Sequence, residues 1–388
     1  MRVLMVSDVY FPRINGVSTS IETFRKTLQA HDIEVEIVAP RYGDEPEESG
    51  VTRVKGRQIP FSLDVEDKWL SWRKMKSAVL ERARECDLIH IHTPFVAHYA
   101  GIHAARLLRL PALATYHTLF TEYLQYYVSF LPRRHLSRIA RSFSRRQCNA
   151  LDAVVVPSAA MLEQLTAYGV RAPMHILPTG VPLEKFARGN RAAFRQEHGI
   201  DEARPVALFV GRVAHEKNIG FLLRVWARAL RQNPNLLLLV AGDGPALPDL
   251  KKEAETLGIA HAVHFLGYLD RNAALLDCYA AADVFVFSSL TETQGLVLPE
   301  AMAAGLPVIA LSRLGTRDIL EAGKGCLAPP EDEDAFTETV LRFFSDAALR
   351  ARLQAEAPET ARDWSDAASS RRMAELYRTL ASSTPRHD

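Results

Sequence analysis

The chain has 388 residues and a formal net charge of +1 at pH 7, with 48% hydrophobic and 24% charged residues. This length exceeds what one hydrophobic core usually supports, so it predicts two domains of roughly 180 to 200 residues each. The near-zero net charge argues against nucleic acid as a bulk electrostatic partner.

The amino-terminal segment and the cysteines suggest a protein of a reducing compartment. The apolar run at residues 1–6 is too short for the core of a signal peptide, and no run approaches the roughly 20 residues that span a bilayer. The cysteines lie too far apart for a C-x-x-C metal pair or a small disulfide framework. We therefore expect a cytoplasmic protein whose membrane contact, if any, is peripheral on the inner face of the cell membrane.

Short apolar runs alternate with helical patterns along the whole chain, which predicts parallel sheets covered by helices on both faces. The strands predicted in the first half are 3–6, 35–38, 88–91, 112–115, 153–156 and 175–177. Those predicted in the second half are 206–210, 236–241, 263–265, 284–287 and 307–310. We expect two doubly wound domains, 1–178 and 183–362, followed by a terminal helix over 363–381.

Two residues follow predicted strands of the first half. Gly16 comes after the first strand and a short loop, where a glycine lets main-chain amides approach a phosphate. His117 comes after the strand at 112–115 and is therefore expected at the same carboxyl edge of the sheet. Taken singly, a glycine or a histidine at a strand end is commonly structural.

The stretch after His117 is first aromatic and then basic. It contains Tyr123, Tyr126 and Tyr127, followed by Arg133, Arg134, Arg138, Arg141, Arg145 and Arg146 with no acidic residue among the arginines. Apolar residues interleave with these arginines at helical spacing. A basic amphipathic helix beside an aromatic segment suits an anionic membrane surface. A solvated cationic face on a helix that packs against the core explains the pattern equally well.

A glycine turn follows the first predicted strand of the second half. Gly211 and Arg212 come directly after the strand at 206–210, and Lys217 lies five residues further on. Two cations at the carboxyl end of a strand can neutralise a diphosphate without a metal. The alternative is a pair of solvated surface cations.

Two carboxylates, Glu292 and Glu300, stand eight residues apart across the start of a predicted helix. Between them lie Thr293, Gln294, Gly295 and Leu296. The helix start favours a phosphate, whereas the carboxylates favour the hydroxyl groups of a sugar. The combination predicts a sugar nucleotide as the ligand, although glutamates that merely cap a helix are the simpler alternative. Tyr268, after the strand at 263–265, is expected near the base.

Two patterns resemble metal sites but have structural explanations. The acidic run at 332–334 precedes a helical pattern over 335–344 and reads as an acidic helix start. His90 and His92 alternate on one strand, but no third ligand is apparent, so we favour a structural role and predict no metal site.

The segment from Glu292 to Glu300 resembles the E-x-x-x-x-x-x-x-E signature of the family 4 retaining glycosyltransferases. Those enzymes have the GT-B fold, in which two Rossmann-like domains face each other across a cleft. Gly211, Arg212 and Lys217 resemble the G-R-x-x-x-x-K pattern of the same family. The resemblance implies that Glu292 contacts the donor sugar and Glu300 the ribose.

The resemblance also implies roles for the remaining positions. Arg212 and Lys217 would stabilise the departing phosphate, His117 would contact the transferred sugar, and residues 293–296 would lie against the donor. The family commonly has two adjacent glycines where this chain has Asn15 and Gly16, so only Gly16 is carried over. The turn at 242–245 resembles a glycine-rich turn of the family's nucleotide domain. Family members fold a terminal helix back onto the first domain, so the resemblance implies the same for the helix over 363–381.

The activity implied is the metal-independent, retaining transfer of a hexose, glucose or mannose, from a UDP- or GDP-hexose to a hydroxyl acceptor. Residues 116–123 are similar to those of bacterial members that glycosylate diacylglycerol or phosphatidylinositol, which favours a membrane lipid as the acceptor. A GT-B-like sugar-nucleotide epimerase and a non-catalytic sugar-nucleotide-binding subunit are the alternatives. The sugar, the base and the oligomeric state stay open.

Overall fold

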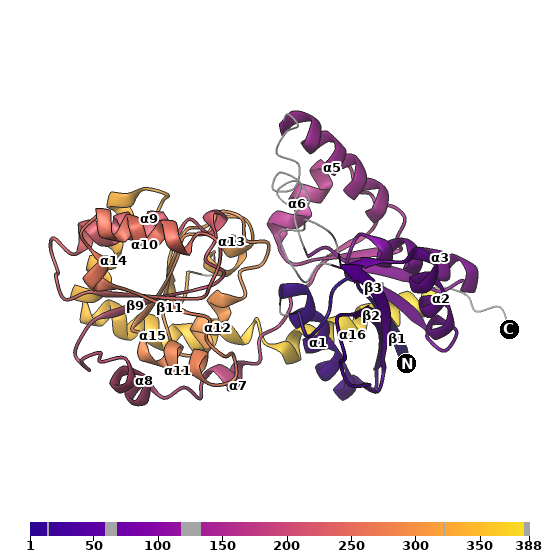
Figure 1. Ribbon diagram of the computed structural model, residues 1–388, viewed down its shortest axis with the longest axis horizontal. Helices are drawn as coiled ribbons and strands as arrows, with labels where there is room; N and C mark the ends of the chain where they lie inside the picture. The colour runs from indigo at the N-terminus through magenta and orange to yellow at the C-terminus, as the bar shows by residue number, and fades with distance from the viewer. Residues whose placement is uncertain (14, 59–67, 118–132, 322, 384–388) are drawn as a thin grey trace. The chain divides into compact units, whose positions relative to one another are not determined.

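The structure is a computed structural model that describes residues 1–13, 15–58, 68–117, 133–321 and 323–383. It divides into two compact units, one formed by Met1–Gly180 with Asp366–Asp388 and the other by Val181–Ser365. Each unit is built on a mainly parallel sheet with helices on both faces (Figure 1). The prediction of two doubly wound folds is confirmed.

The described part of the first unit contains an eight-stranded sheet with the order β4-β3-β2-β1-β5-β6-β7-β8. All pairs are parallel except β3 with β4, which is antiparallel. The strands are β1 (Arg2–Val6), β2 (Glu34–Arg41), β3 (Val51–Gln58), β4 (Lys68–Leu70), β5 (Leu88–Ile91), β6 (Ala112–Thr115), β7 (Ala153–Val156) and β8 (Met174–Ile176). Because β1 and β5 are neighbours, the strand order reverses between them.

The described helices of this unit are α1 (Gly16–Thr27), η1 (Leu28–His31), α2 (Trp72–Ala83), α3 (Val96–Leu108), α5 (Arg133–Cys148), α6 (Ala159–Ala167) and α16 (Asp366–Ser383). Alternate residues of each strand point to opposite faces. Leu4 and Val6 of β1 share a core with α2, α3 and α6. Val3 and Met5 share the other core with α1 and with α16, which returns from the carboxyl terminus (Figure 1). The first sheet is therefore buried on both faces.

The second unit holds a parallel sheet with the order β11-β10-β9-β12-β13-β14. Its strands are β9 (Val206–Val210), β10 (Leu237–Ala241), β11 (Val263–Gly267), β12 (Val284–Phe287), β13 (Val308–Ala310) and β14 (Cys326–Leu327). The chain moves outward from β9 to β11 and then resumes at β12 on the other side of β9. The strand order therefore reverses between β9 and β12, which makes this a topological switch point.

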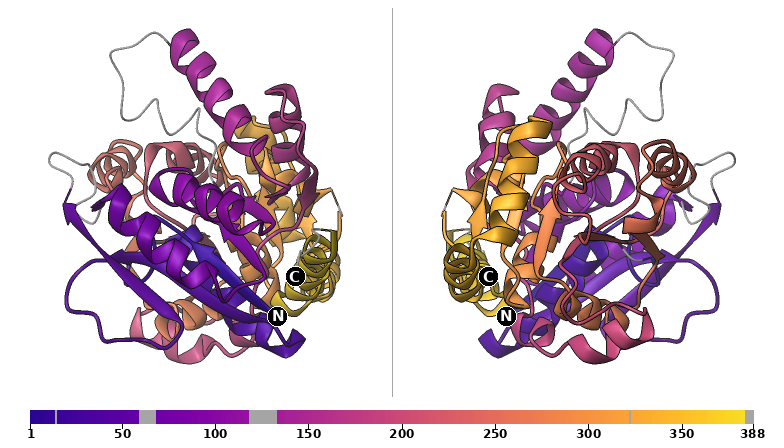
Figure 2. Two further views of the ribbon diagram at one scale, coloured as in Figure 1. Left: turned by 90° about the vertical axis from the view of Figure 1, so that its right-hand side faces the viewer. Right: turned by 90° about the vertical axis from the view of Figure 1, so that its left-hand side faces the viewer.

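The helices α9 (Ile219–Ala229), α10 (Leu247–Thr256) and α14 (Glu333–Ser345) lie on one face of the second sheet (Figures 1 and 2). The opposite face carries α8 (Arg191–Glu197), α11 (Ala274–Ala281), α12 (Val297–Ala303) and α15 (Ala347–Arg362), with α7 (Leu183–Phe186) beside α12. The remaining helical segments are η2 (His215–Lys217), η3 (Ala260–Ala262) and α13 (Gly315–Leu320). Phe209 of β9 stacks on Phe287 of β12 with ring centroids 5.5 Å apart, which packs the centre of the core.

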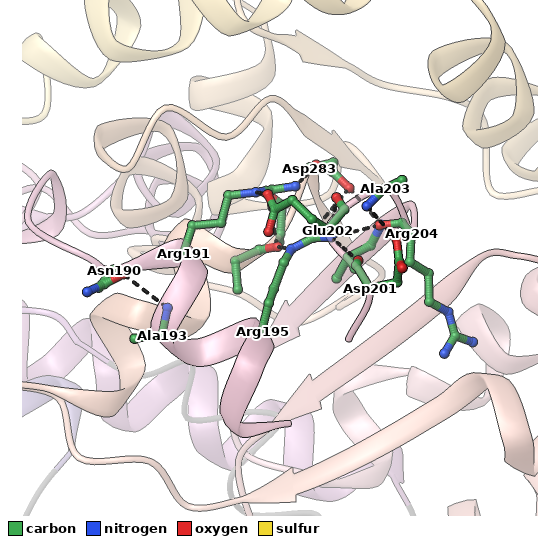
Figure 3. A network of polar contacts seen from close by, with 12 residues as sticks. Asn190, Arg191, Ala193, Arg195, Asp201, Glu202, Ala203, Arg204 and Asp283 are labelled. Carbon is green, nitrogen blue, oxygen red and sulfur yellow. Dashed lines mark hydrogen bonds and ion pairs between the residues drawn. The ribbon is translucent and has the colours of Figure 1, made fainter. Parts of the chain in front are cut away.

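A buried arginine fixes the amino-terminal ends of β9 and β12. The Arg195 side chain is 1% exposed and donates to Ala281 O at 2.9 Å and to Asp201 O at 2.8 Å. Arg195 and Arg191 both reach the Asp283 carboxylate, which also accepts from the Val206 N–H at 2.8 Å (Figure 3). Asp283 and Val206 stand at the starts of their strands, so this network lies at the end of the sheet away from the switch-point loops.

The strands that sequence reasoning missed are β3, β4 and β14. β3 contains Arg53 and Lys55 and lies near one edge of its sheet, where Val54 is buried but Lys55 is exposed. β14 has two residues and forms the edge of the second sheet. Edge strands lack the continuous apolar run of a strand that is buried on both faces, and this run was the signal used to find the others.

Candidate functional site

Polar side chains gather at the carboxyl ends of β1 and β5, where the strand order of the first sheet reverses. The Thr93 hydroxyl donates to Asp8 Oδ2 at 2.8 Å, and the Ala97 N–H donates to Asp8 Oδ1 at 3.0 Å. Asp8 therefore joins the two loops and caps the start of α3. Burial raises the pKa of Asp8 to about 6, although the hydrogen bonds from Thr93 and the start of α3 act in the opposite direction.

Three histidines form a row beside this junction, and we call His90, His92 and His117 the histidine row. His90 Nδ1 lies 2.6 Å from the Tyr377 hydroxyl of α16, and its Nε2 lies 2.7 Å from Thr115 Oγ1. The rings of His90 and His92 are 4.1 Å apart between centroids, and His92 Nδ1 lies 3.1 Å from His117 Nε2.

All three histidines are neutral near pH 7. Burial lowers the pKa of His90 to about 3 and that of His117 to about 4, and it lowers the pKa of His92 well below the usual value. His90 uses both ring nitrogens to join β5, β6 and α16, which gives it a structural role. His117 lies at the sheet edge that the sequence predicted for it, next to His92.

Gly16 is the first residue of α1, and its side of the helix is open. A Cβ atom placed on Gly16 would meet no heavy atom within 4 Å. The preceding Asn15 is the N-cap, since its side chain accepts from the Ser18 N–H at 2.9 Å. Where the family commonly has a second glycine, this chain therefore has a capping residue, and nothing in the fold requires Gly16 to lack a side chain.

The predicted acceptor segment lies partly outside the described residues. Tyr123, Tyr126 and Tyr127 fall in the range 118–132, and only the backbone is described at Arg133 and Arg134. In the rest of α5, Arg138 and Arg141 are exposed, whereas Ala140, Ser144 and Gln147 are buried at helical spacing. The described part of the helix thus packs on a narrow stripe and presents Arg138 and Arg141 to solvent.

An apolar hollow of about 500 Å³ lies near the same sheet edge and is lined by Trp72, Phe95, Val96 and Tyr99. Three of these side chains are unusually exposed for aromatic residues, at 42% for Trp72, 48% for Phe95 and 51% for Tyr99. Phe95 lies two residues after Thr93, so the hollow adjoins the loop that carries His92. Sequence reasoning did not identify this patch.

In the second unit, the loops after β9 and β12 meet at the switch point. Lys217 Nζ forms an ion pair with Glu292 Oε1, and each side chain is 19% exposed. The Ser288 hydroxyl lies 2.9 Å from Asn218 O and 3.1 Å from Lys217 O, so it ties the β9 loop to the end of β12. The backbone holds Glu292 as well, because the Gly315 N–H donates to Glu292 O at 2.8 Å. Arg212 is exposed in the same β9 loop.

The second predicted carboxylate, Glu300, is buried in α12 with a side chain 5% exposed. Its Oε1 pairs with Arg271 Nη2, and its Oε2 accepts a hydrogen bond from the Tyr279 hydroxyl at 3.1 Å. Burial, followed by the Glu300 charge, raises the pKa of Tyr279 well above its usual value, so the phenol remains a donor. Glu300 therefore belongs to a triad with Arg271 and Tyr279, neither of which the sequence pattern suggested.

Other predicted residues occupy the same loops. Thr293 and Leu296 are half-buried and Gln294 is buried. Gly295 has a φ of 76°, a left-handed backbone conformation that favours glycine. Tyr268 follows β11 and is 62% exposed, which leaves its ring open to solvent.

The glycines of the turn at 242–245 have a packing role. A Cβ atom on Gly242 would lie 1.9 Å from Gly211 O, and one on Gly244 would lie 2.4 Å from Val213 O. These glycines let the β10 turn pack directly against the backbone of the β9 loop.

The described residues contain no group of three or more His, Cys, Asp or Glu side chains arranged to hold a metal ion. The acidic run at 332–334 starts a helix as predicted, because the Asp332 side chain caps α14 by accepting from the Ala335 N–H at 2.9 Å. Glu333 also pairs with Arg224 of α9 at 2.7 Å. Over the same described ranges, no helix is long and apolar enough to cross a membrane.

Two family models match the two halves of the chain. Residues 14–185 match the model described as Glycosyltransferase Family 4, and residues 190–360 match the one described as Glycosyl transferases group 1. The chain is 33% identical over 318 residues to an alpha-monoglucosyldiacylglycerol synthase of Streptococcus pneumoniae, covering 80% of this chain and 71% of that protein. It is 31% identical over 324 residues to a GDP-mannose-dependent alpha-mannosyltransferase of Mycolicibacterium smegmatis, covering 82% of each.

Solved structures share the fold along nearly the whole chain. Sucrose-phosphate synthase from Thermosynechococcus elongatus superposes with a TM-score of 0.82 at 22% identity, covering 98% of this chain and 99% of that one. HepE from Anabaena, in complex with UDP and glucose, gives a TM-score of 0.77 at 18% identity, covering 98% of this chain and 100% of that one. At these identities the likeness concerns the fold alone.

Proposed function

The chain belongs to the family 4 glycosyltransferases, and from this premise we propose that it transfers a hexose from a nucleoside diphosphate sugar to a hydroxyl group of a membrane lipid. The fold is GT-B. The ion pair between Lys217 and Glu292 at the switch point of the second sheet carries the proposal. Ligands of open α/β sheets bind at the carboxyl ends of the strands at such a point.

The chemistry of this pair suits a sugar nucleotide. Within the described ranges, the Lys217 charge is paired with the Glu292 carboxylate. A diphosphate would draw on Lys217 and on the exposed Arg212, which would stabilise the negative charge that develops on the leaving group. Glu292 would then accept hydrogen bonds from the hydroxyls of the sugar next to the phosphates. Together, the three residues provide cations for the phosphates and an acceptor for the sugar.

The Glu300 triad supports a ribose contact. Each carboxylate oxygen has two lone pairs, so the contacts from Arg271 and Tyr279 leave acceptor capacity on Glu300 for ribose hydroxyls. Both partners hold the carboxylate in one orientation. The loop of residues 293–296 connects the two glutamates, and we assign its backbone to the phosphates and the sugar.

We infer that the reaction retains the configuration of the sugar and needs no metal. Two cations of the β9 loop replace the divalent ion that would otherwise neutralise the diphosphate. In a retaining transfer of this type, the leaving phosphate oxygen can take the proton of the acceptor hydroxyl. His117 is assigned to contact with the transferred sugar.

Two observations support a lipid acceptor. The S. pneumoniae relative is named for a glycolipid, alpha-monoglucosyldiacylglycerol. In this chain, the exposed side chains of Trp72, Phe95 and Tyr99 offer an apolar surface beside the loop that carries His92. We propose that diacylglycerol or a related lipid packs its apolar part here. The exposed arginines of α5 would add attraction to an anionic membrane surface, with the protein bound peripherally on its cytoplasmic side.

Donor and acceptor screening tests the proposal. The purified protein is incubated with UDP-glucose or GDP-mannose and with vesicles that contain diacylglycerol, and the products are identified by mass spectrometry. We expect a glycolipid and a free nucleoside diphosphate only when donor and acceptor are both present. Excess EDTA should leave the rate unchanged, and the anomeric coupling constants of the product should match those of the donor.

Glu292→Gln is the matched variant, since it keeps the shape of the side chain and removes the charge. It should bind vesicles normally and form no product. An epimerised sugar nucleotide that appears without an acceptor would identify an epimerase instead. Tight nucleotide binding without turnover on any acceptor would identify a binding subunit.

A further inference from the structure

The histidine row contains a buried nitrogen that makes no hydrogen bond within the part of the chain that the structure describes. His92 is 2% exposed, and its Nε2 atom has no partner among the described residues. Its other ring nitrogen, Nδ1, lies 3.1 Å from His117 Nε2. Buried polar atoms without a hydrogen-bond partner are uncommon. The cost of leaving Nε2 unpaired depends on whether it carries a proton, and this indicates the tautomer of His92.

The contact between His92 and His117 runs edge to edge. The ring planes are 23° apart and the centroids are 5.4 Å apart. The centroid distance equals the 3.1 Å distance between the two nitrogens plus about one ring radius on each side. The two nitrogens therefore lie on the line that joins the ring centroids. The lone pair and the N–H of imidazole both lie in the ring plane, so the geometry suits one N–H···N hydrogen bond.

Only one direction of that bond agrees with the surroundings. If His117 donated from Nε2, His92 would carry its proton on Nε2 and leave a buried N–H without an acceptor. If His92 donates from Nδ1, its Nε2 is a bare acceptor, which is the less costly group to leave unpaired. His92 then holds its proton on Nδ1, and His117 holds its proton on Nδ1 as well.

We propose that His92 is a positioning residue that holds His117 in the Nδ1–H tautomer. In this tautomer, His117 Nε2 accepts the hydrogen bond from His92 Nδ1, and His117 Nδ1 carries the proton. His117 can therefore donate a hydrogen bond, but its Nε2 atom cannot remove a proton from an incoming hydroxyl. The proposal refines the role of His117 by assigning its tautomer, and it rests on the proposed function only for the effect of that tautomer on turnover.

The surroundings keep His92 in place. His90 packs on it with ring centroids 4.1 Å apart and is itself held by the Tyr377 hydroxyl of α16 and by Thr115 of β6. The backbone adds a further constraint, since the His92 N–H donates to Val6 O at 2.9 Å. The tautomer of His117 thus depends on a chain of contacts that begins at the carboxyl-terminal helix.

Nitrogen-15 NMR tests the proposal directly. Protein labelled with ¹⁵N-histidine is examined at pH 7 by long-range proton–nitrogen correlation, and the His117 signals are assigned by their loss in His117→Gln. We expect the Nδ1–H pattern for His117 in the wild-type protein. A predominant Nε2–H pattern would overturn the proposal, and this readout does not depend on the protein having any activity.

Two substitutions at His92 add a kinetic test. His92→Asn keeps an N–H donor near the position of Nδ1, whereas His92→Leu removes it. We expect His92→Leu to lose the single tautomer of His117 and to lower kcat about tenfold or more with little change in the donor KM, as loss of a supporting hydrogen bond commonly does. His92→Asn should restore most of both properties.

The exposed His175 of β8 supplies the control, because His175→Asn removes a histidine of the same unit without touching the row. If His92→Leu keeps the wild-type tautomer and kcat, the proposal is wrong. If it does not fold, the wild-type tautomer and the His92→Asn variant still decide. Absence of transfer with every donor and acceptor would count against the proposed function and leave the NMR result standing.

Discussion

Removal of Arg271 should destabilise the second unit and weaken donor binding together. In Arg271→Met, the Glu300 carboxylate would stay buried at 5% exposure with the Tyr279 hydroxyl as its remaining described partner. Breaking a buried ion pair from one side costs about 3–5 kcal/mol. The Arg271 side chain is 35% exposed, so water replaces part of its contact, and we expect a loss near the lower end, about 3 kcal/mol.

The assay combines unfolding with donor binding. For a unit of this size, 1 kcal/mol corresponds to about 2–4 °C, so the Tm of the second unit should fall by about 6–12 °C. Calorimetric titration of UDP-hexose or GDP-hexose should show at least a tenfold weaker Kd, about 1.4 kcal/mol, because Glu300 is no longer held for the ribose. Arg271→Met combined with Glu300→Gln should recover roughly half of the lost stability, since the buried charge is gone.

Arg352→Met is the control. Arg352 forms an exposed ion pair with Glu356 at 3.9 Å in α15, and such pairs contribute about 1 kcal/mol at most. If Arg271→Met were as mild as this control, or if the double variant were no more stable than Arg271→Met, the argument that Glu300 depends on Arg271 would be refuted.

Four further outcomes are expected. Lys217→Met and Glu292→Gln should each abolish transfer and leave the far-ultraviolet circular dichroism unchanged; wild-type turnover by either would contradict the roles assigned to the pair. Gly16→Val should fold normally, because a side chain there meets open space, yet lose donor turnover; full activity would remove Gly16 from the site. Arg195→Met should cost about 3 kcal/mol or more in urea unfolding, since it removes several buried hydrogen bonds to carbonyl groups and one of the two arginines that pair with Asp283; a loss below about 1 kcal/mol would show that water and Arg191 substitute for it. Burial lowers the pKa of every member of the histidine row, so the unfolded chain binds more protons below about pH 6.5 and stability should fall as the pH drops from there toward about 4. The raised pKa of Asp8 acts in the opposite direction between about pH 6 and 4, and urea midpoints that rise on acidification would mean that it dominates.

Much of the fold was readable from local pattern. The predicted bounds of β5, β6, β7, β9 and β12 coincide with those observed, because each is a short apolar run buried on both faces. β3 lay outside this signal, since its alternating polar residues reflect partial cover near an edge. The acidic helix start at 332–334 was also readable, because the interactions that begin a helix, such as the bond from the Ala335 N–H to Asp332, join residues close in the chain.

The sequence indicated which residues belong to the site, but it did not indicate which of them contact one another. Lys217 and Glu292 were each singled out, but their ion pair joins positions 75 residues apart. Arg271 and Tyr279 gave no local pattern that marks a partner of Glu300. His92 was assigned a structural role without a named partner, and its neighbours turned out to be His90, from the strand just before it, and His117, from the loop after the next strand in the sheet.

The amino-acid sequence by itself determined the class of fold, the division into two units and the chemical character of the loops. These features follow from the spacing of apolar residues, the turn residues and the charges, which can all be read from neighbouring positions. Only the tertiary structure decided which loops meet. Strand order brings Asp8 to Thr93, 85 residues away, and α16 brings Tyr377 to His90 across 287 residues. These contacts form because adjacent parallel strands end at one edge and a returning helix covers one face, so their partners are selected by the packing of the whole sheet.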